Sequence, residues 1–422
     1  MARKHETEVM VVGAGPVGML AALMLVEREV QVEIIDEEWR PAARSYALAL
    51  HPRALELLDE VGLARELLKE GHRLHRVAFY DGAERRAEVS LAELSGAYPF
   101  LLVLPQKSLE GALEHRLRHH DIDVRWNHKL AGLSLDGDQP VATVEKLAKE
   151  STGYSVATTV WVVEDEIVTA ADFVVGADGH RSAVRRALGV DFESLGEPEL
   201  YAVFEITVED GPHLDAMRDE VRVVLDQGTT NVLWPLGGGR FRWSFQVKVS
   251  TMGLERPDKS RLAVQVGRHA YPYLTREDLE GLIRVRAPWF DAAVGEVPWS
   301  VAVQFERRLA ASFGRGGVWL AGDAAHLALP VGVHSMNLGL AEAHDLADRM
   351  ARVLRKGAPR SEVEAYGPKH RAVWQRLLED KVEAGPEATE WAREHRGHIV
   401  PCLPAAGEDL GRLAGQLGLR PG

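Results

Sequence analysis

Residues 8–36 read EVMVVGAGPVGMLAALMLVEREVQVEIID, and this stretch decides the fold. Its short apolar run Val9–Val12 is rich in β-branched residues and predicts a buried strand. Gly13, Gly15 and Gly18 follow at the spacing G-x-G-x-x-G. These glycines permit a tight turn, leave room for a pyrophosphate and let the next helix pack close to the strand.

The residues after the glycines complete a strand–turn–helix–strand unit. Pro16 stands at the expected first helical position, and the helix should run to about Arg28 with its N-terminus facing phosphates. A second strand, Val30–Ile35, leads to Asp36, which can hold ribose hydroxyls. This context predicts dinucleotide binding. A membrane helix over Val9–Val26 is the alternative, but glycines and a proline interrupt its first half.

Composition narrows the function classes. The chain has 422 residues, of which 46% are hydrophobic, so two or three packed units are expected. The formal net charge of −13 argues against a nucleic-acid partner. Cys402 is the only cysteine, which excludes an intramolecular disulfide and a redox-active cysteine pair. We expect a cytoplasmic protein with no signal peptide, membrane span or metal site, and the oligomeric state stays open.

Two later stretches carry polar residues at strand ends. In ADFVVGADGHRSAVRRALG (171–189), a strand should stop at Gly176, before a turn at Asp178-Gly179 and a helix from about Ser182. It can close a cofactor site from the opposite side, although an ordinary strand–helix turn would look the same. In 316–350, a strand over Val318–Ala321 leads to Gly322-Asp323, where open α/β sheets bind ligands.

A loop and a helix follow that third stretch. The loop contains Pro330 and Gly332, and the helix should begin near Met336–Asn337. Its N-terminus can offer N–H groups to the carbonyl of a ring.

Residues 200–305 predict an antiparallel sheet. Apolar and polar residues alternate in Arg240–Val249, and glycines at 237–239 suit a hairpin. This pattern indicates a sheet with one face packed against another part of the molecule. Candidates for a substrate wall are Tyr201, His213, Trp234 and Trp243, although both tryptophans are more simply read as core. Tyr46 and His334 could also lie near a substrate, and the catalytic residues stay unknown.

The domain division follows from these elements. We expect an α/β protein with a discontinuous Rossmann-like cofactor domain (1–75, 105–195 and 306–360). An antiparallel substrate domain (76–104 and 196–305) should be inserted into it. The C-terminal segment, 361–422, should be helical, and the sequence assigns it only packing.

The three motif stretches together resemble the class A flavoprotein aromatic hydroxylases, the family of p-hydroxybenzoate hydroxylase and the polyketide hydroxylases. The resemblance spans residue 8 to about 375 and implies FAD as cofactor. It places the ADP part at the glycine motif, the pyrophosphate near Asp178 and the ribityl chain at Asp323. By position it implies FAD-binding roles for Gly13, Gly15, Pro16, Val17, Gly18, Asp36, Glu37, Arg44, Gln106, Leu130, Asp178, Gly322, Asp323, Pro330, Gly332, Met336 and Asn337.

The chain departs from the family at three points. Asp36 stands where glutamate is usual, and Val333 and Ser335 replace two glycines of the pattern P-x-G-G-Q-G-M-N. The larger polyketide hydroxylases add a thioredoxin-like domain, which we do not expect after residue 375.

The resemblance implies a monooxygenase. NADH or NADPH would bind transiently and reduce FAD, and O2 would form a flavin C4a-hydroperoxide. One oxygen atom would then enter an aromatic or polyketide-like small molecule. Hydroxylation, epoxidation and ring expansion stay open. The alternatives are a halogenase, whose W-x-W-x-I-P signature is absent, a reductase or dehydrogenase of the same fold, and a non-catalytic FAD-binding protein.

Overall fold

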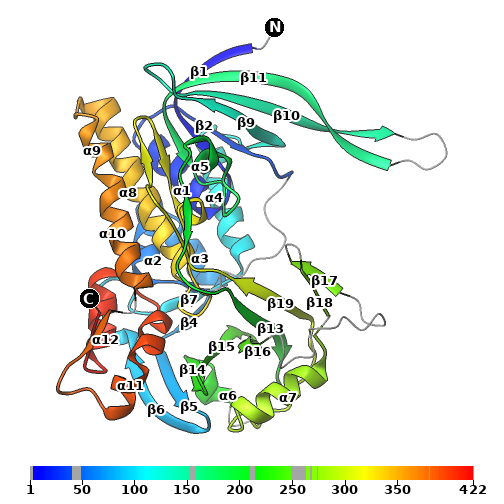
Figure 1. Cartoon of the computed structure of the whole chain (residues 1–422), viewed down its shortest axis with the longest axis vertical. Helices are drawn as coiled ribbons and strands as arrows, with labels where there is room; N and C mark the ends of the chain where they lie inside the picture. Colours follow the sequence, from blue (N-terminus) through cyan, green and yellow to red (C-terminus); the bar gives the residue numbers. More distant parts are fainter. Residues whose placement is uncertain are drawn as a thin grey trace.

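The computed structural model describes residues 3–39, 49–152, 158–209, 214–248, 263–266, 269–272, 274–379 and 381–421. In Figure 1 a parallel sheet with its helices occupies the upper part of the molecule and a second, largely antiparallel sheet the lower part. The expected α/β class with a second sheet is therefore confirmed.

The parallel sheet is built around β1 (Arg3–Val12). Its neighbours are β2 (Val32–Asp36) and β11 (Thr158–Gly176), and β8 (Arg125–Trp126) and β22 (Val318–Leu320) extend it on the two sides. Helices α1 (Pro16–Val26) and α8 (His334–Lys356) pack together against it. The apolar run at the end of β1 is almost fully buried, as a strand covered on both faces should be.

One part of this sheet differs from the sequence expectation. The strand expected within 171–189 does stop at Gly176, but it is the end of β11, a single strand of 19 residues that begins at Thr158. Residues 158–170 of β11 pair with β10 (Val141–Thr152), which pairs with β9 (His128–Ser134). The β10–β11 hairpin projects from the body in Figure 1. The stretch TVEKLAKE (143–150) is rich in helix-forming residues, and only pairing with β11 makes it a strand.

The second sheet has the strand order β19-β13-β16-β15-β14-β5-β6. One face packs on α7 (Arg276–Arg286), whose start Thr275 and Asp278 cap reciprocally. The glycines at 237–239 all have positive φ and join β15 to β16. The seven strands are β5 (Arg76–Asp81), β6 (Glu84–Ser90), β13 (Glu199–Thr207), β14 (Glu220–Asp226), β15 (Thr229–Gly237), β16 (Arg240–Val247) and β19 (Trp299–Phe305).

The C-terminal segment covers the other face of this sheet. Apolar residues of α11 (Glu390–Ile399) and α12 (Gly407–Gly415) share a buried cluster with the sheet. Gln416 makes two hydrogen bonds to the backbone of Ser90 on β6, at 2.7 and 2.9 Å. Of the polar side chains of β16, Arg242 and Ser244 are buried, Gln246 is half-buried and Arg240 is exposed.

The remaining helices and strands complete these units. They are β3 (Ala49–Leu50), α2 (Pro52–Glu60), α3 (Ala64–Glu70), β4 (His72–Leu74), β7 (Leu101–Val103), α4 (Gln106–His119), α5 (Ala183–Ala187), β12 (Phe192–Ser194), α6 (Leu214–Met217), β17 (Ala263–Val266), β18 (His269–Pro272), β20 (Arg308–Ala310), β21 (Gly314–Arg315), β23 (His326–Leu327), α9 (Ser361–Glu364), α10 (Tyr366–Leu378), β24 (Val382–Ala384) and β25 (Leu419–Pro421). Among the described residues, no helix has the length and apolarity needed to cross a membrane.

Candidate functional site

The glycine turn between β1 and α1 lies against the second motif stretch. A Cβ on Gly13, which has φ +103°, would lie 2.3 Å from the carbonyl oxygen of Ala177. A Cβ on Gly15 would meet nothing within 4 Å, so open space borders the start of α1. Pro16 begins that helix, as expected. The turn thus combines close packing on one side with room for a phosphate on the other.

Asp36 supports the glycine turn directly. One carboxylate oxygen accepts a hydrogen bond from the backbone N–H of Ala14 at 2.6 Å, and the other accepts one from Glu38 at 2.8 Å. A carboxylate has about four acceptor positions, so it can still accept from ribose hydroxyls. Glu37 is exposed beside it.

Asp178 organises the second stretch. Its Oδ2 accepts hydrogen bonds from the backbone N–H groups of Ala183 and Val184, at 2.6 and 3.1 Å, at the start of α5. Burial raises the pKa of this carboxyl. Its Oδ1 is buried without a hydrogen-bond partner in the described part of the chain. Such an acceptor suits a ligand that brings a donor.

Arg185, which the sequence analysis missed, joins the second stretch to the third. Its guanidinium donates to the carbonyl oxygens of Ala324 and His180, each at 2.7 Å, and lies over the ring of Phe192. The residue is buried although the sequence shows only one arginine among several in a basic helix. No pattern distinguishes it from Arg186, which is exposed.

The third stretch is held from α8. Glu342, fully buried, accepts hydrogen bonds from the backbone N–H of Gly322 at 2.9 Å and from the indole of Trp374 at 2.7 Å. It also pairs with His326 at 2.9 Å. Burial acts to raise the pKa of Glu342, but His326, His370 and the backbone N–H of Gly322 outweigh it and hold the pKa below its ordinary value. A charged residue four positions from both Leu338 and Leu346, on the apolar face, was the available sequence signal.

This anchoring leaves Asp323 pointing outward. Asp323 is exposed at the end of β22, next to Gly322. A Cβ on Gly322, which has φ +64°, would lie 3.1 Å from Val17, so Val17 acts here as a packing residue of α1. The three motif stretches therefore meet around the start of α1, with an open space, an unpartnered acceptor and an exposed carboxylate. This arrangement fits an extended dinucleotide cofactor.

The loop before α8 is closely packed. Val333, at a position where the family has glycine, adopts left-handed backbone angles (φ +53°). A Cβ on Gly332 would lie 2.4 Å from the carbonyl oxygen of Pro401. Asn337 uses its side chain within the protein, accepting from the N–H of His51 and donating to Ala49 and Val333. Any contact of Asn337 with a cofactor would therefore come from its backbone. Pro330 and Met336 are half-buried nearby.

Other expected cofactor residues lie elsewhere around the sheet. Gln106 begins α4 and donates to Glu110 at 2.5 Å. Leu130 has a buried side chain on β9, so only its backbone could contact a ligand. Arg44, Tyr46 and His213 lie outside the described residues.

A cavity of about 190 Å³ lies between the second sheet, the loop before α8 and the C-terminal segment. Tyr201 lines it, whereas Trp234 packs in the adjoining cluster and Trp243 lies on the other face of the sheet against α7. The Tyr201 hydroxyl donates to Glu199 at 3.2 Å, and Gln246 donates to the same carboxylate oxygen at 2.7 Å. The lining of the cavity includes Glu199, Tyr201, Gln246, Arg307, Leu329, Val331, His334, Leu377, His398 and Cys402.

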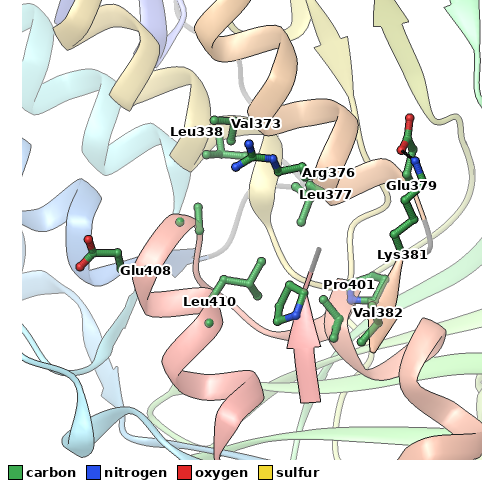
Figure 2. Close-up of a pocket in the computed structure, with 15 residues that line it drawn as sticks. Leu338, Val373, Arg376, Leu377, Glu379, Lys381, Val382, Pro401, Glu408 and Leu410 are labelled. Carbon is green, nitrogen blue, oxygen red and sulfur yellow. Dashed lines mark hydrogen bonds and ion pairs between the residues drawn. The ribbon is translucent and has the colours of Figure 1, made fainter. Parts of the chain in front are cut away.

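A second hollow, of about 400 Å³, lies between α10, α12 and β25 (Figure 2). Its walls are largely apolar, and Arg376 extends toward Leu338 and Val373. None of its described lining residues carries a buried polar atom without a partner. It therefore offers less to a polar ligand than the cavity at Tyr201. Across the described part of the chain, no group of His, Cys, Asp and Glu side chains is arranged to hold a metal ion.

Known proteins resemble this chain over most of its length. A family model described as an FAD binding domain matches residues 6–381. Pentachlorophenol 4-monooxygenase of Sphingobium chlorophenolicum is 27% identical over 379 residues, covering 89% of this chain and 63% of the relative. The 6-methylpretetramide 4-monooxygenase of Streptomyces rimosus is 31% identical over 374 residues, covering 88% of this chain and 60% of the relative. The chain thus spans less than two thirds of either relative.

A solved structure supports the same fold. The p-nitrophenol 4-monooxygenase of Pseudomonas putida DLL-E4 superimposes with a TM-score of 0.71, covering 98% of this chain and 94% of that one. Its sequence identity of 21% makes this likeness evidence of fold alone.

Proposed function

The chain belongs to the class A FAD-dependent aromatic hydroxylases, and from that membership we propose that it is an NAD(P)H-dependent monooxygenase. Its substrate would be an aromatic or polyketide-like small molecule that receives one oxygen atom from O2. The observation that carries this proposal is the meeting of three distant motif stretches, the third of which continues into the loop that lines the cavity at Tyr201.

The FAD-binding residues follow from the site. The start of α1 and Gly15 would hold the pyrophosphate, Asp36 the adenosine ribose and Asp323 the ribityl chain. FAD, when bound, supplies the redox chemistry of oxygen activation. The positive end of α8 would stabilise negative charge on a ring placed before it.

The cavity supports substrate binding beside that ring. It borders Leu329, Val331 and His334 of the loop before α8, and Pro401 and Cys402 of the C-terminal segment complete its wall. A substrate that fills this cavity would exclude water from the ring, and water would otherwise promote unproductive release of hydrogen peroxide. Tyr201 is a candidate for the substrate wall of this cavity, where its hydroxyl donates to Glu199.

NAD(P)H would bind without a domain of its own. The chain has one G-x-G-x-x-G motif in the required strand–helix context, and Gly314–Gly317 precedes a strand instead of following one. We therefore expect a transient complex with the nicotinamide cofactor.

The test is oxygen consumption by purified protein loaded with FAD. With NADPH or NADH present, a suitable phenol should increase the rate and give an oxygenated product. Reduction of the flavin without an oxygenated product from a broad panel of phenols and polycyclic phenols would instead indicate a reductase. Bound flavin that neither nicotinamide cofactor reduces would indicate a non-catalytic FAD-binding protein.

A further inference from the structure

His334 is a buried histidine whose two ring nitrogens both lack a hydrogen-bond partner among the described residues. It is the first residue of α8, is 3% exposed and lines the cavity at Tyr201. Buried polar atoms are normally paired, because an unpaired one has lost its water without gaining a protein partner. Two such atoms on one side chain at a cavity wall therefore point to a ligand.

Three polar side chains near His334 do have hydrogen-bond partners within the protein. His51, whose ring meets that of His334 edge-on at 5.7 Å, makes a 2.9 Å hydrogen bond with the carbonyl oxygen of Gly332. The Cys402 thiol donates to the carbonyl oxygen of His398, and Tyr201 donates to Glu199. The imidazole of His334 is thus left available, and of the other described lining residues only Arg307 has a buried side-chain atom, its Nε, without a hydrogen-bond partner.

We propose that His334 determines substrate specificity by hydrogen bonding to the hydroxyl group of a one-ring phenol in this cavity. The proposal rests on the proposed function and names the substrate class of the same site. The cavity, at about 190 Å³, is smaller than the roughly 300–1,000 Å³ typical of sites for drug-sized ligands. It therefore suits one ring better than a fused polycycle.

The protonation state of His334 matches a phenol. Burial lowers the pKa of His334 to about 4, so its imidazole is neutral near pH 7, with one N–H donor and one acceptor nitrogen. A phenolic hydroxyl likewise both donates and accepts. A methyl ether of the same ring carries a methyl group in place of the hydroxyl hydrogen, so it has no donor and the acceptor nitrogen would stay unpaired against it.

A polar edge of the flavin ring is the other possible partner, since His334 stands at the start of α8. The two partners give different results when the imidazole is removed. A substrate partner predicts altered discrimination between phenol and ether with unchanged FAD affinity. A flavin partner predicts weakened FAD binding.

The test measures equilibrium binding of 4-chlorophenol and 4-chloroanisole to the FAD-loaded protein by calorimetry. The native protein should prefer the phenol by at least about tenfold. His334→Leu should lose that preference, whereas His334→Gln, which keeps a donor and an acceptor, should retain part of it. Cys402→Ala, on the same wall, should keep it, because the Cys402 thiol already has a protein partner.

Three results would overturn the proposal. They are an unchanged preference in His334→Leu, a loss of FAD affinity in His334→Leu and His334→Gln alike, and no binding of 4-chlorophenol by the native protein up to its solubility limit. If His334→Leu does not fold, His334→Gln decides, since a full loss of preference there also contradicts the proposal. No reductant or turnover is required, so failure of the monooxygenase reaction is distinguishable from failure of this proposal.

Discussion

Val333 is the residue whose backbone conflicts most with its side chain. It is β-branched, buried and left-handed at the start of α8, close to the cavity. The left-handed region costs a residue with a Cβ about 1–2 kcal/mol, which glycine avoids. The strain lies in the loop that borders the proposed flavin and substrate sites, where strained backbone is commonly found.

The free energies of unfolding of Val333→Gly and Val333→Ala should therefore differ in the direction opposite to that at an ordinary helical position. Both lose the buried valine side chain, but only glycine relieves the left-handed strain. The glycine variant should have the higher free energy of unfolding, by about 1 kcal/mol, whereas in an ordinary helical position alanine is favoured by a similar amount. Urea unfolding of the two variants measures this. A more stable alanine variant would show that Val333 is not left-handed.

At the scale of the element, α8 joins both parts of the site. Its first turn lies beside the cavity, and Glu342, two turns later, anchors the stretch that carries Asp323. Glu342→Ala should lower the free energy of unfolding by about 3–5 kcal/mol, because it leaves buried donors and His326 unpaired. Asp348→Ala, on the outer side of the same helix, should cost less than about 1 kcal/mol.

Carboxylates on the same helix make the stability of the fold depend on pH. The folded-state pKa values of Glu342 and Asp345 are held below their ordinary values, although burial acts to raise both. His326 lowers the pKa of Glu342, and hydrogen bonds from His370 and Arg349 lower that of Asp345. Groups with lowered pKa values stabilise the fold above their unfolded pKa, near 4, and this stabilisation is lost as pH falls through the folded pKa. Unfolding midpoints measured from pH 6 to 3 should fall, and less steeply in Glu342→Gln. Equal slopes would contradict this assignment.

The sequence predicts best those features that depend on local sterics. The roles of the glycines at 13, 15 and 18 can be predicted because a tight turn and a close helix approach require glycine. The role of Pro16 can be predicted because proline fits the first position of a helix. Arg185, Glu342 and the unpaired state of His334 depend on what packs around them from far along the chain. Strand β10 was missed because its lysines, glutamates and alanines favour helix, and tertiary pairing overrode that preference.

At the scale of the whole molecule, FAD would connect segments from residue 13 to residue 337. Ligand that binds only the folded state stabilises it, by about 2.7 kcal/mol at a hundredfold excess over Kd. Adding FAD to stripped protein should raise its Tm, and the gain should shrink in Asp323→Asn. Asp348→Asn, away from the site, should keep the full gain. Equal gains in both variants would exclude Asp323 from FAD binding.

The C-terminal segment forms part of the wall of the cavity at Tyr201. It packs on the second sheet, holds Ser90 through Gln416 and brings Pro401 and Cys402 to the cavity wall. The sequence assigned this segment only packing, but the packing itself shapes the proposed substrate site. Leu413→Ala, in the buried face of α12, should cost about 2–5 kcal/mol. A loss below about 1 kcal/mol in urea unfolding would show that the segment is loosely docked.

The most direct test of the central claim is the fate of isotope-labelled O2. The FAD-loaded protein is supplied with NADPH or NADH, labelled O2 and a panel of one-ring phenols, and products are analysed by mass spectrometry. A monooxygenase predicts a product that carries one labelled oxygen atom. If every phenol leaves all consumed O2 as hydrogen peroxide and no product is labelled, the account is contradicted.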